Sequence, residues 1–166
     1  MTSTYGVRYV LSDIVQKTLA VEIRAGWTFT PRLSLQAYLQ PYIGTGDYRL
    51  FKELAAARTF RFNVFGQANG STLDYENGTY TADPDGPGPA RAFSFADPDF
   101  SLKSLRGTVV LRWEYRPSSM LYLVWTQRRA DGSRPGDFSL WRDLEDLFQA
   151  PGDNIILLKA SYRFEL

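Results

Sequence analysis

The sequence predicts an all-β fold, an antiparallel up-and-down β-barrel of the transmembrane type, of which this chain forms the C-terminal portion. Three observations lead to this prediction. Apolar and polar residues alternate along about six segments, tight and long connections alternate between them, and aromatic residues gather at the segment ends beside the tight connections. The 166 residues suit one domain.

Period-two alternation identifies the strands in chain order. The pattern is weak in the first segment and regular in the other five: Tyr5–Leu11, Leu19–Phe29, Leu33–Ile43, Gly107–Arg116, Leu121–Arg128 and Ile156–Leu166. Several segments exceed the ~5–6 residues of an ordinary strand and match the ~9–11 residues of a membrane-crossing one. Alternation alone fits a soluble barrel with an apolar interior as well as a membrane barrel with an apolar exterior.

The connections favour the membrane interpretation. Thr30–Arg32 and Pro117–Ser119 are tight, Ser12–Lys17 is longer, and the connections at about 44–102 and 129–153 are long enough to be outer loops. Outer-membrane barrels combine short periplasmic turns with long outer loops in this way. Two short segments in the first long loop, Thr59–Phe65 and Thr79–Thr81, are a less favoured source of two further strands.

The two faces of the ribbon carry different residue types. The predicted lumen-lining set is polar and mostly cationic: Glu22, Arg24, Arg112, Glu114, Arg116, Arg128, Lys159 and Arg163. The predicted aromatic girdle at the lipid–water boundary is Trp27, Phe29, Trp113, Tyr115, Tyr162 and Phe164. The cationic excess of the lumen set leaves two interpretations, anion preference and interior ion pairing, of which the second is favoured.

Six strands do not close a bacterial barrel, because such barrels begin at ~8 strands and an open sheet edge cannot face hydrocarbon. We therefore expect the remaining N-terminal strands of the same barrel, or other subunits, to complete it. No signal peptide is recognisable at Met1–Tyr5, which favours a mature or truncated chain.

The last eight residues, Lys159–Leu166, resemble the terminal-strand signal of outer-membrane barrels. Ser161 stands where Gly is usual, and Leu166 where Phe is commonest. This resemblance implies a location in the bacterial outer membrane, contact with outer-membrane lipid, and the barrel-assembly machinery as a partner.

Most of the chain from about Thr18 onward resembles the C-terminal barrel of the domain of unknown function 5916 family. The segments that carry the resemblance are Phe29–Pro31, Leu33–Tyr38, Gln40–Ile43, Phe51–Leu54, Asp97–Phe100, Ser104–Gly107, Leu111–Pro117 and Val124–Arg129. That family comprises large bacterial envelope proteins with an N-terminal carbohydrate-binding domain of the family-9-like type. The resemblance implies an outer-membrane β-barrel, with any sugar-related role coming by association only.

The second long loop is expected to hold a short helix within Asp137–Gln149, with Asp137 as N-cap. One face of this helix carries an apolar stripe of Leu140, Trp141, Leu144, Leu147 and Phe148. The favoured interpretation is a helix that packs to order the loop. The alternative is an outer-loop lid formed by Leu140, Trp141, Leu144 and Phe148. Asp143, Glu145, Asp146 and Gln149 are expected to face away from the stripe. A second loop helix is expected at Arg49–Ala57.

Catalytic and metal-binding patterns are weak. The chain has no Cys and no His, which excludes thiol nucleophiles, disulfides, His-based triads and Cys/His zinc sites. Asp83, Asp85, Asp97 and Asp99 could supply oxygen ligands to calcium, but Ser94 stands where the closing Glu is needed, so no metal is predicted. Nor is any cofactor or catalytic residue predicted.

The charge balance of nineteen basic and eighteen acidic residues gives no electrostatic basis for nucleic-acid binding. The sequence therefore predicts a non-catalytic outer-membrane β-barrel segment of an envelope protein, serving transport or surface binding, carbohydrate-related binding included. Two alternatives stay open: a soluble, lipocalin-like β-barrel that binds an apolar ligand, and the barrel part of a membrane-associated hydrolase.

Overall fold

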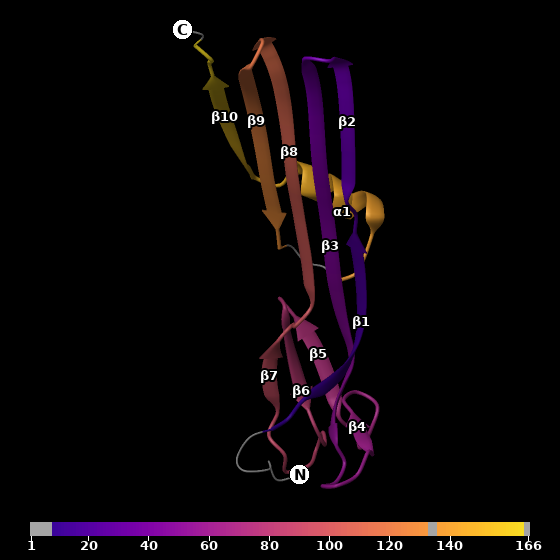
Figure 1. Cartoon of the computed structure of the whole chain (residues 1–166). Helices are drawn as coiled ribbons and strands as arrows, with labels where there is room; N and C mark the ends of the chain where they lie inside the picture. The colour runs from indigo at the N-terminus through magenta and orange to yellow at the C-terminus, as the bar shows by residue number, and fades with distance from the viewer. Residues whose placement is uncertain (1–7, 133–135, 165–166) are drawn as a thin grey trace. The chain divides into compact units, whose positions relative to one another are not determined.

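The computed structural model describes residues 8–132 and 136–164, which form mostly antiparallel β-structure with a single helix in that part of the chain (Figure 1). The all-β prediction is confirmed. The residues divide into two compact units, one made of the chain up to Gln16 together with Gly46–Asp99, the other of Lys17–Thr45 together with the chain from Phe100. Two strands, β1 (Leu11–Ala20) and β3 (Leu33–Leu54), run from one unit into the other.

The large sheet has the strand order β1-β3-β8-β9-β10, and β2 and β4 also pair with β3. Its remaining members in the second unit are β2 (Ile23–Thr30), β8 (Phe100–Arg116), β9 (Ser119–Asp131) and β10 (Gly152–Ser161). Turns at Pro31–Arg32 and Pro117–Ser118 join β2 to β3 and β8 to β9, as the sequence predicts. The Glu114 N–H donates to Arg32 O at 2.8 Å, which links the turn end of β8 to the start of β3.

The strand boundaries differ from those predicted in several places. β8 and β10 begin at Phe100 and Gly152, before the expected Gly107 and Ile156. β1 occupies the expected Ser12–Lys17 connection, and the expected long strand from Leu19 divides into the end of β1 and β2. The predicted helix at Arg49–Ala57 is wrong, because β3 continues through Leu54 and pairs there with β4 (Phe62–Val64). The residues Tyr5 to Val7 of the expected first strand and Glu165 and Leu166 of the last lie outside the described residues.

The continuation of β3 follows from burial on one side of the strand. Phe51 and Glu53 are buried, whereas Leu50 and Leu54 are exposed, so the side chains alternate with a period of two. A helix would have placed Phe51 and Leu54 on one face. The partner strand β4 supplies the backbone hydrogen bonds that settle the choice.

The first unit holds a small sheet of its own, with the order β5-β6-β7 (Thr72–Glu76, Thr79–Asp83 and Phe93–Ala96). Asn77 and Gly78 join β5 to β6 with φ of 50° and 78°, the left-handed values of the hairpin turn that Asn-Gly predicts. Phe51, Phe65 and Ala82 form its buried cluster, to which Tyr80, Phe93 and Phe95 add their rings. This aromatic cluster gives the unit its core.

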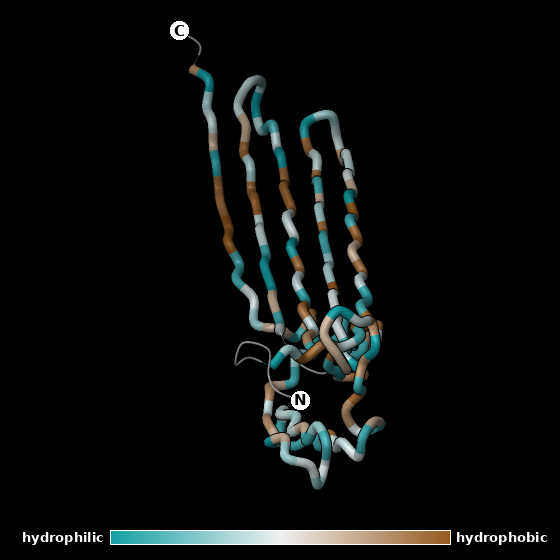
Figure 2. Tube along the Cα trace, turned by 90° about the horizontal axis from the view of Figure 1, so that it is seen from below, coloured by the Kyte–Doolittle hydropathy of each residue, from teal (hydrophilic) through white to brown (hydrophobic). Residues whose placement is uncertain are grey.

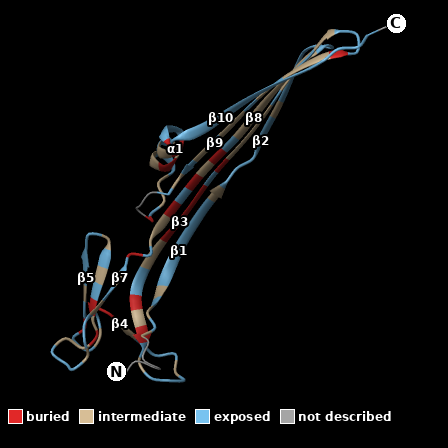
Figure 3. Ribbon diagram, turned by 90° about the vertical axis from the view of Figure 1, so that its left-hand side faces the viewer, coloured by how far each residue is buried: buried red, intermediate tan, exposed pale blue. Residues whose placement is uncertain are grey.

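Within the described residues, the large sheet ends at β10, whose side chains are all exposed (Figure 3). One edge of β10 pairs with β9 from Gly152 to Ser161, and the other edge has no strand beside it in the same part of the chain. No helix in residues 8–132 and 136–164 is both long and apolar enough to cross a lipid bilayer.

Candidate functional site

The strand register gathers most of the large apolar side chains on one face of the second unit's sheet, while Val110, Val124 and Leu157 form a shorter apolar row on the other face. Leu111 lies opposite Leu123, and Leu123 opposite Leu158, so three leucines form one row across β8, β9 and β10. Trp27 lies opposite Leu35 in the hairpin of β2 and β3. Colouring by hydropathy shows brown segments alternating with teal and white ones along the other strands, and one longer brown run in β10, the strand that leads to the C-terminus (Figure 2). We call this side of the sheet the apolar face and the other side the polar face.

The apolar face is solvent-exposed in this chain. Leu123 is 40% exposed, Leu158 64% and Ile156 71%, although they lie within regular strands. A soluble monomer rarely leaves contiguous large apolar side chains open to water. An exposed apolar face of this kind is a candidate interaction surface.

Aromatic residues border the apolar face at its turn end, where the girdle is predicted. Tyr162 and Phe164 contact each other with ring centroids 4.6 Å apart, and Trp113 and Tyr115 with centroids 6.1 Å apart. The Tyr115 hydroxyl donates to Ser161 O at 3.1 Å, so the aromatics of β8 meet those that directly follow β10 at one level. Phe29, 60% exposed, belongs to the same end, whereas Trp27 lies further along the sheet opposite Leu35.

Polar side chains border the apolar face at its other end. Gln127 lies opposite Asn154, and its amide nitrogen donates to Asn154 Oδ1 at 3.2 Å. The indole N–H of Trp125 donates to the same oxygen at 3.1 Å, with its ring two residues nearer the leucine row. Trp125, absent from the predicted girdle, has the amphipathic placement of a second one. The apolar face thus has a boundary of polar atoms at both ends.

The polar face carries most of the predicted lumen-lining set. Arg112, Arg128 and Lys159 are exposed, and the Arg24 guanidinium pairs with Glu22 at 2.7 Å. That pair joins near neighbours in the chain and is not the cross-strand interior pairing expected. Arg163, at the turn end, donates from its guanidinium to Ser118 Oγ at 3.2 Å, and Glu114 accepts from Ser118 N–H at 3.0 Å.

Arg116 is positioned by a bulge between Glu114 and Arg116, where the β8–β9 register shifts. Its guanidinium donates to the Tyr162 hydroxyl at 2.9 Å and lies 5.8 Å from the centroid of that ring. A predicted lumen residue thus contacts a predicted girdle residue. An alternation count cannot anticipate this contact, because each bulge changes the phase of the strand.

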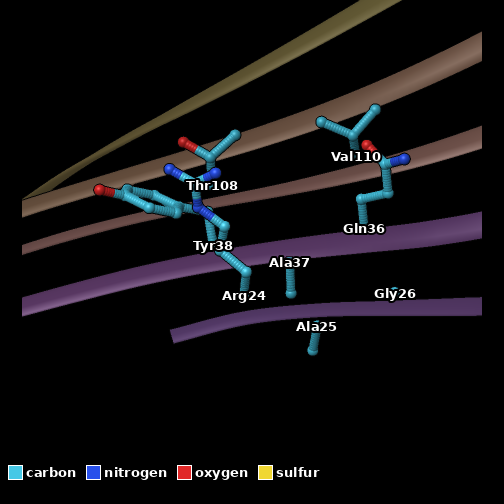
Figure 4. Close-up of a pocket in the computed structure, with 8 residues that line it drawn as sticks. All are labelled: Arg24, Ala25, Gly26, Gln36, Ala37, Tyr38, Thr108 and Val110. Atoms are coloured by element: carbon cyan, nitrogen blue, oxygen red, sulfur yellow. The ribbon is translucent and has the colours of Figure 1, made fainter. Parts of the chain in front are cut away.

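A groove of about 420 Å³ lies on the polar face across β2, β3 and β8. Arg24, Gln36, Tyr38, Thr108 and Val110 point to the groove side, whereas Ala25 and Ala37 point away from it (Figure 4). The Arg24 guanidinium lies 5.5 Å from the centroid of the Tyr38 ring. The groove offers a cation, an aromatic face and amide and hydroxyl groups, which suits binding of a polar solute and contains no nucleophile–base pair.

The predicted helix in the second long loop is confirmed as α1 (Leu140–Gln149), but two details of the prediction are wrong. The N-cap is Ser139 and not Asp137. Of the residues expected to face away, Asp146 instead pairs with Lys103 on the sheet, and Asp143 is completely buried. The physical reason is the ring of donors around its carboxylate. Ser139 N–H donates to Asp143 Oδ2 at 2.8 Å, and Arg142 donates to Oδ1.

Lys103 on β8 is the centre of this buried network. Its ammonium lies 2.6 Å from Asp146, 3.5 Å from Asp131 and 3.6 Å from Asp143, and its side chain is 2% exposed. Burial disfavours the charged ammonium and is the largest single influence. The hydrogen bond to Asp146 and the three carboxylate charges together outweigh it, so the pKa of Lys103 is raised above its ordinary value.

Helix α1 is attached to the apolar face of the sheet. Lys103 and Leu105 lie an even number of residues from Leu111 on β8, so their side chains point to the same side. Arg129, which lies opposite Leu105, donates to Phe148 O and to Ala150 O at the end of the helix. Figure 3 shows the helix beside one side of the sheet. Of the residues predicted to form a lid, Trp141 and Phe148 remain 81% and 54% exposed.

The carboxylates considered for calcium make turns in the first unit. Asp83 Oδ1 accepts from Asp85 N–H at 3.3 Å and from Gly86 N–H at 3.0 Å, and Asp97 Oδ1 accepts from Asp99 N–H at 3.0 Å. These are the local bonds by which Asp stabilises turns. No group of three or more metal-ligating side chains occurs in the described part of the chain.

No family model, curated protein or solved structure matches this chain.

Proposed function

We propose that this chain is a segment of an outer-membrane β-barrel of a Gram-negative bacterium, with its apolar face against lipid and its polar face toward an aqueous lumen. The observation that carries the proposal is the exposed apolar face, bounded at both ends by aromatic residues and polar atoms. An outward apolar band between aromatic girdles is the pattern of such barrels. The resemblance to the domain of unknown function 5916 family is part of the same proposal.

In this proposal, β10 pairs with a further strand. The strand β10 has one edge without a partner in the described residues, and it contains Ile155–Leu158, four consecutive apolar residues that are each more than half exposed. Unpaired backbone groups cannot remain in hydrocarbon, so the edge requires a partner strand. The remaining N-terminal strands of the same barrel, or another subunit, supply it, and the barrel-assembly machinery is the expected partner during insertion.

The proposed role is non-catalytic transport or surface binding of a polar solute. The groove at Arg24, Gln36 and Tyr38 would face the lumen, where the exposed Arg112, Arg128 and Lys159 favour an anionic or hydroxyl-rich solute. A carbohydrate is one such solute, since sugars combine hydroxyl groups with a face that stacks on aromatic rings.

A soluble barrel with an apolar interior is the second candidate. The observation that favours it is the position of α1, whose buried Leu147 covers the same face as a core helix would. A lipocalin-like protein would enclose an apolar ligand against Leu111 and Leu123.

The absence of cysteine from the chain allows a direct test with single-cysteine variants. Leu123→Cys and Tyr122→Cys place thiols at neighbouring positions of β9, one on the apolar face of the sheet and the other on the polar face. The full-length protein is produced in a Gram-negative host, the envelope is fractionated, and each variant is treated with a hydrophilic and a lipid-soluble maleimide. We expect extraction to require detergent, Tyr122→Cys to react with the hydrophilic reagent, and Leu123→Cys to react only with the lipid-soluble one.

Recovery of the protein without detergent would contradict the membrane proposal and support the soluble barrel. Labelling of Leu123→Cys by the hydrophilic reagent in intact membranes would also contradict it, because that thiol would then face water. Solute transport is tested separately with the full-length protein in a planar bilayer, where no conductance, or none selective for anions, rejects an anion-selective pore.

A further inference from the structure

We propose that helix α1 is a lipid-surface anchor on the outside of the barrel wall, with Trp141 and Phe148 inserted at the headgroup boundary of the outer leaflet. This inference rests on the proposed function, since it takes the apolar face as the lipid-facing one. It replaces the interpretation of this helix as a lid, because a lid would lie over the lumen.

The first support is the side of the sheet to which α1 is attached. The side chains of Lys103 and Leu105 lie on the side of the sheet that α1 contacts, and the side chain of Leu111 lies on that side too. A helix that closed the lumen would instead contact the polar face, which carries Arg112 and Arg128. The helix therefore lies on the same side as the lipid-facing rows.

The second support is the height of α1 along the strands. The polar pair Gln127 and Asn154 marks the end of the apolar rows, and Arg129 is the next residue on that side of β9. Two residues of a strand span about 7 Å, so Arg129 holds the end of the helix about 7 Å beyond this polar pair. Headgroup regions extend over a similar distance outside the hydrocarbon core.

The third support is that the sheet covers only part of the apolar stripe of α1. The stripe residue Leu147 is fully buried, whereas Trp141 is 81% exposed and Phe148 54% exposed. Trp141 and Phe148 are seven residues apart and so lie on one side of the helix. An amphipathic helix with exposed Trp and Phe beside a bilayer edge places these rings in the interface.

Charge is arranged consistently with a lipid surface. Two of the three carboxylates of α1, those of Asp143 and Asp146, are directed to Lys103, and Asp143 is fully buried. Only Glu145 among these helix carboxylates is left without an ion pair in the described structure. Repulsion between the helix and anionic headgroups is thereby reduced.

The test uses the four tryptophans of the chain, Trp27, Trp113, Trp125 and Trp141. The full-length protein is reconstituted in vesicles of phosphatidylethanolamine and phosphatidylglycerol that contain phosphatidylcholine brominated either near the headgroup or near the chain end. One variant retains only Trp141 and a second retains only Trp113, the other tryptophans being replaced by Phe. We expect Trp141 to lose more fluorescence with the shallow bromines than with the deep ones, and Trp113 to be quenched by brominated lipid as well.

Two failures are distinguishable. Quenching of Trp113 without quenching of Trp141, together with quenching of Trp141 by aqueous iodide, would overturn the anchor and leave the barrel intact. Absence of lipid quenching at both positions would overturn the barrel itself. If a triple replacement does not fold, the difference between the unmodified protein and Trp141→Phe gives the Trp141 signal, and an unchanged shallow quenching in that comparison overturns the anchor.

Discussion

Replacing Lys103 by Met tests whether the buried ion network holds α1 on the sheet. Met preserves much of the apolar stem and removes the ammonium, leaving Asp131, Asp143 and Asp146 around the vacated position. Removing one partner of a buried ion pair costs about 3–5 kcal/mol because a charge is left uncompensated.

The cost at Lys103 is smaller than that range for two structural reasons. Asp143 keeps its bonds from Ser139 N–H and from the Arg142 guanidinium. The carboxylates of Asp131 and Asp146 are 31% and 42% exposed, so water solvates them after the change. We therefore expect α1 to lose about 2–3 kcal/mol of attachment free energy.

Hydrogen exchange measures this quantity locally, because amides of α1 exchange when the helix opens. A loss of 2–3 kcal/mol corresponds to exchange about 30- to 150-fold faster in Leu144–Phe148. Lys159→Met is the matched control, since Lys159 is exposed on the polar face of β10 and its loss should leave α1 exchange unchanged. An increase below about threefold for Lys103→Met, which is under 1 kcal/mol, would refute the reasoning.

Three further predictions concern pH, the aromatic core and a turn. The pKa of Lys103 is higher in the folded protein than its ordinary value of 10.5, so the stabilisation of α1 is complete below pH 10.5 and is lost as the pH rises through the raised pKa. Exchange of α1, corrected for its intrinsic rate, should stay constant to about pH 10 and then increase; an increase already near neutrality would contradict this. Phe51→Ala, at a position 4% exposed, should cost about 3–5 kcal/mol and speed limited proteolysis within Gly46–Asp99, while Phe60→Ala, at a position 95% exposed, should not; equal proteolysis of the two variants would argue against this core. Gly86→Ala would place a Cβ 2.6 Å from a backbone oxygen at a φ of 61°, so it should lower the free energy of unfolding by at least about 1–2 kcal/mol. Gly26→Ala is the control, because its Cβ would meet nothing within 4 Å. Equal thermal unfolding midpoints for the two variants would contradict this prediction.

Local patterns in the sequence were sufficient for much of the sheet. The alternation around Leu111 and Leu123 places side chains on alternate faces of any extended strand, whatever its neighbours. The residues Pro31 and Pro117 end strands locally, because Pro lacks the N–H of the ladder. Patterns among neighbouring residues were therefore enough to predict the tight turns, the two faces of the sheet and the existence of α1.

Prediction failed where two local patterns fit equally well. Arg49–Ala57 suits a helix by residue type, and only the pairing of Lys52 with Val64 across β3 and β4 makes it a strand. Arg116 meets Tyr162 because a bulge shifts the strand by one residue, which depends on how the two strands are joined at Pro117–Ser118.

The sequence by itself determined that this chain forms long two-faced strands joined by tight turns, because alternation and turn chemistry act over a few neighbouring residues. Only the tertiary structure decided which charged groups are buried and which side of the sheet α1 occupies. Lys103 and Asp143 are forty residues apart in the chain, and neither has a local signal for burial. Their charges can leave water only when the folded sheet brings them together, so the attachment of the helix is a property of the assembled chain.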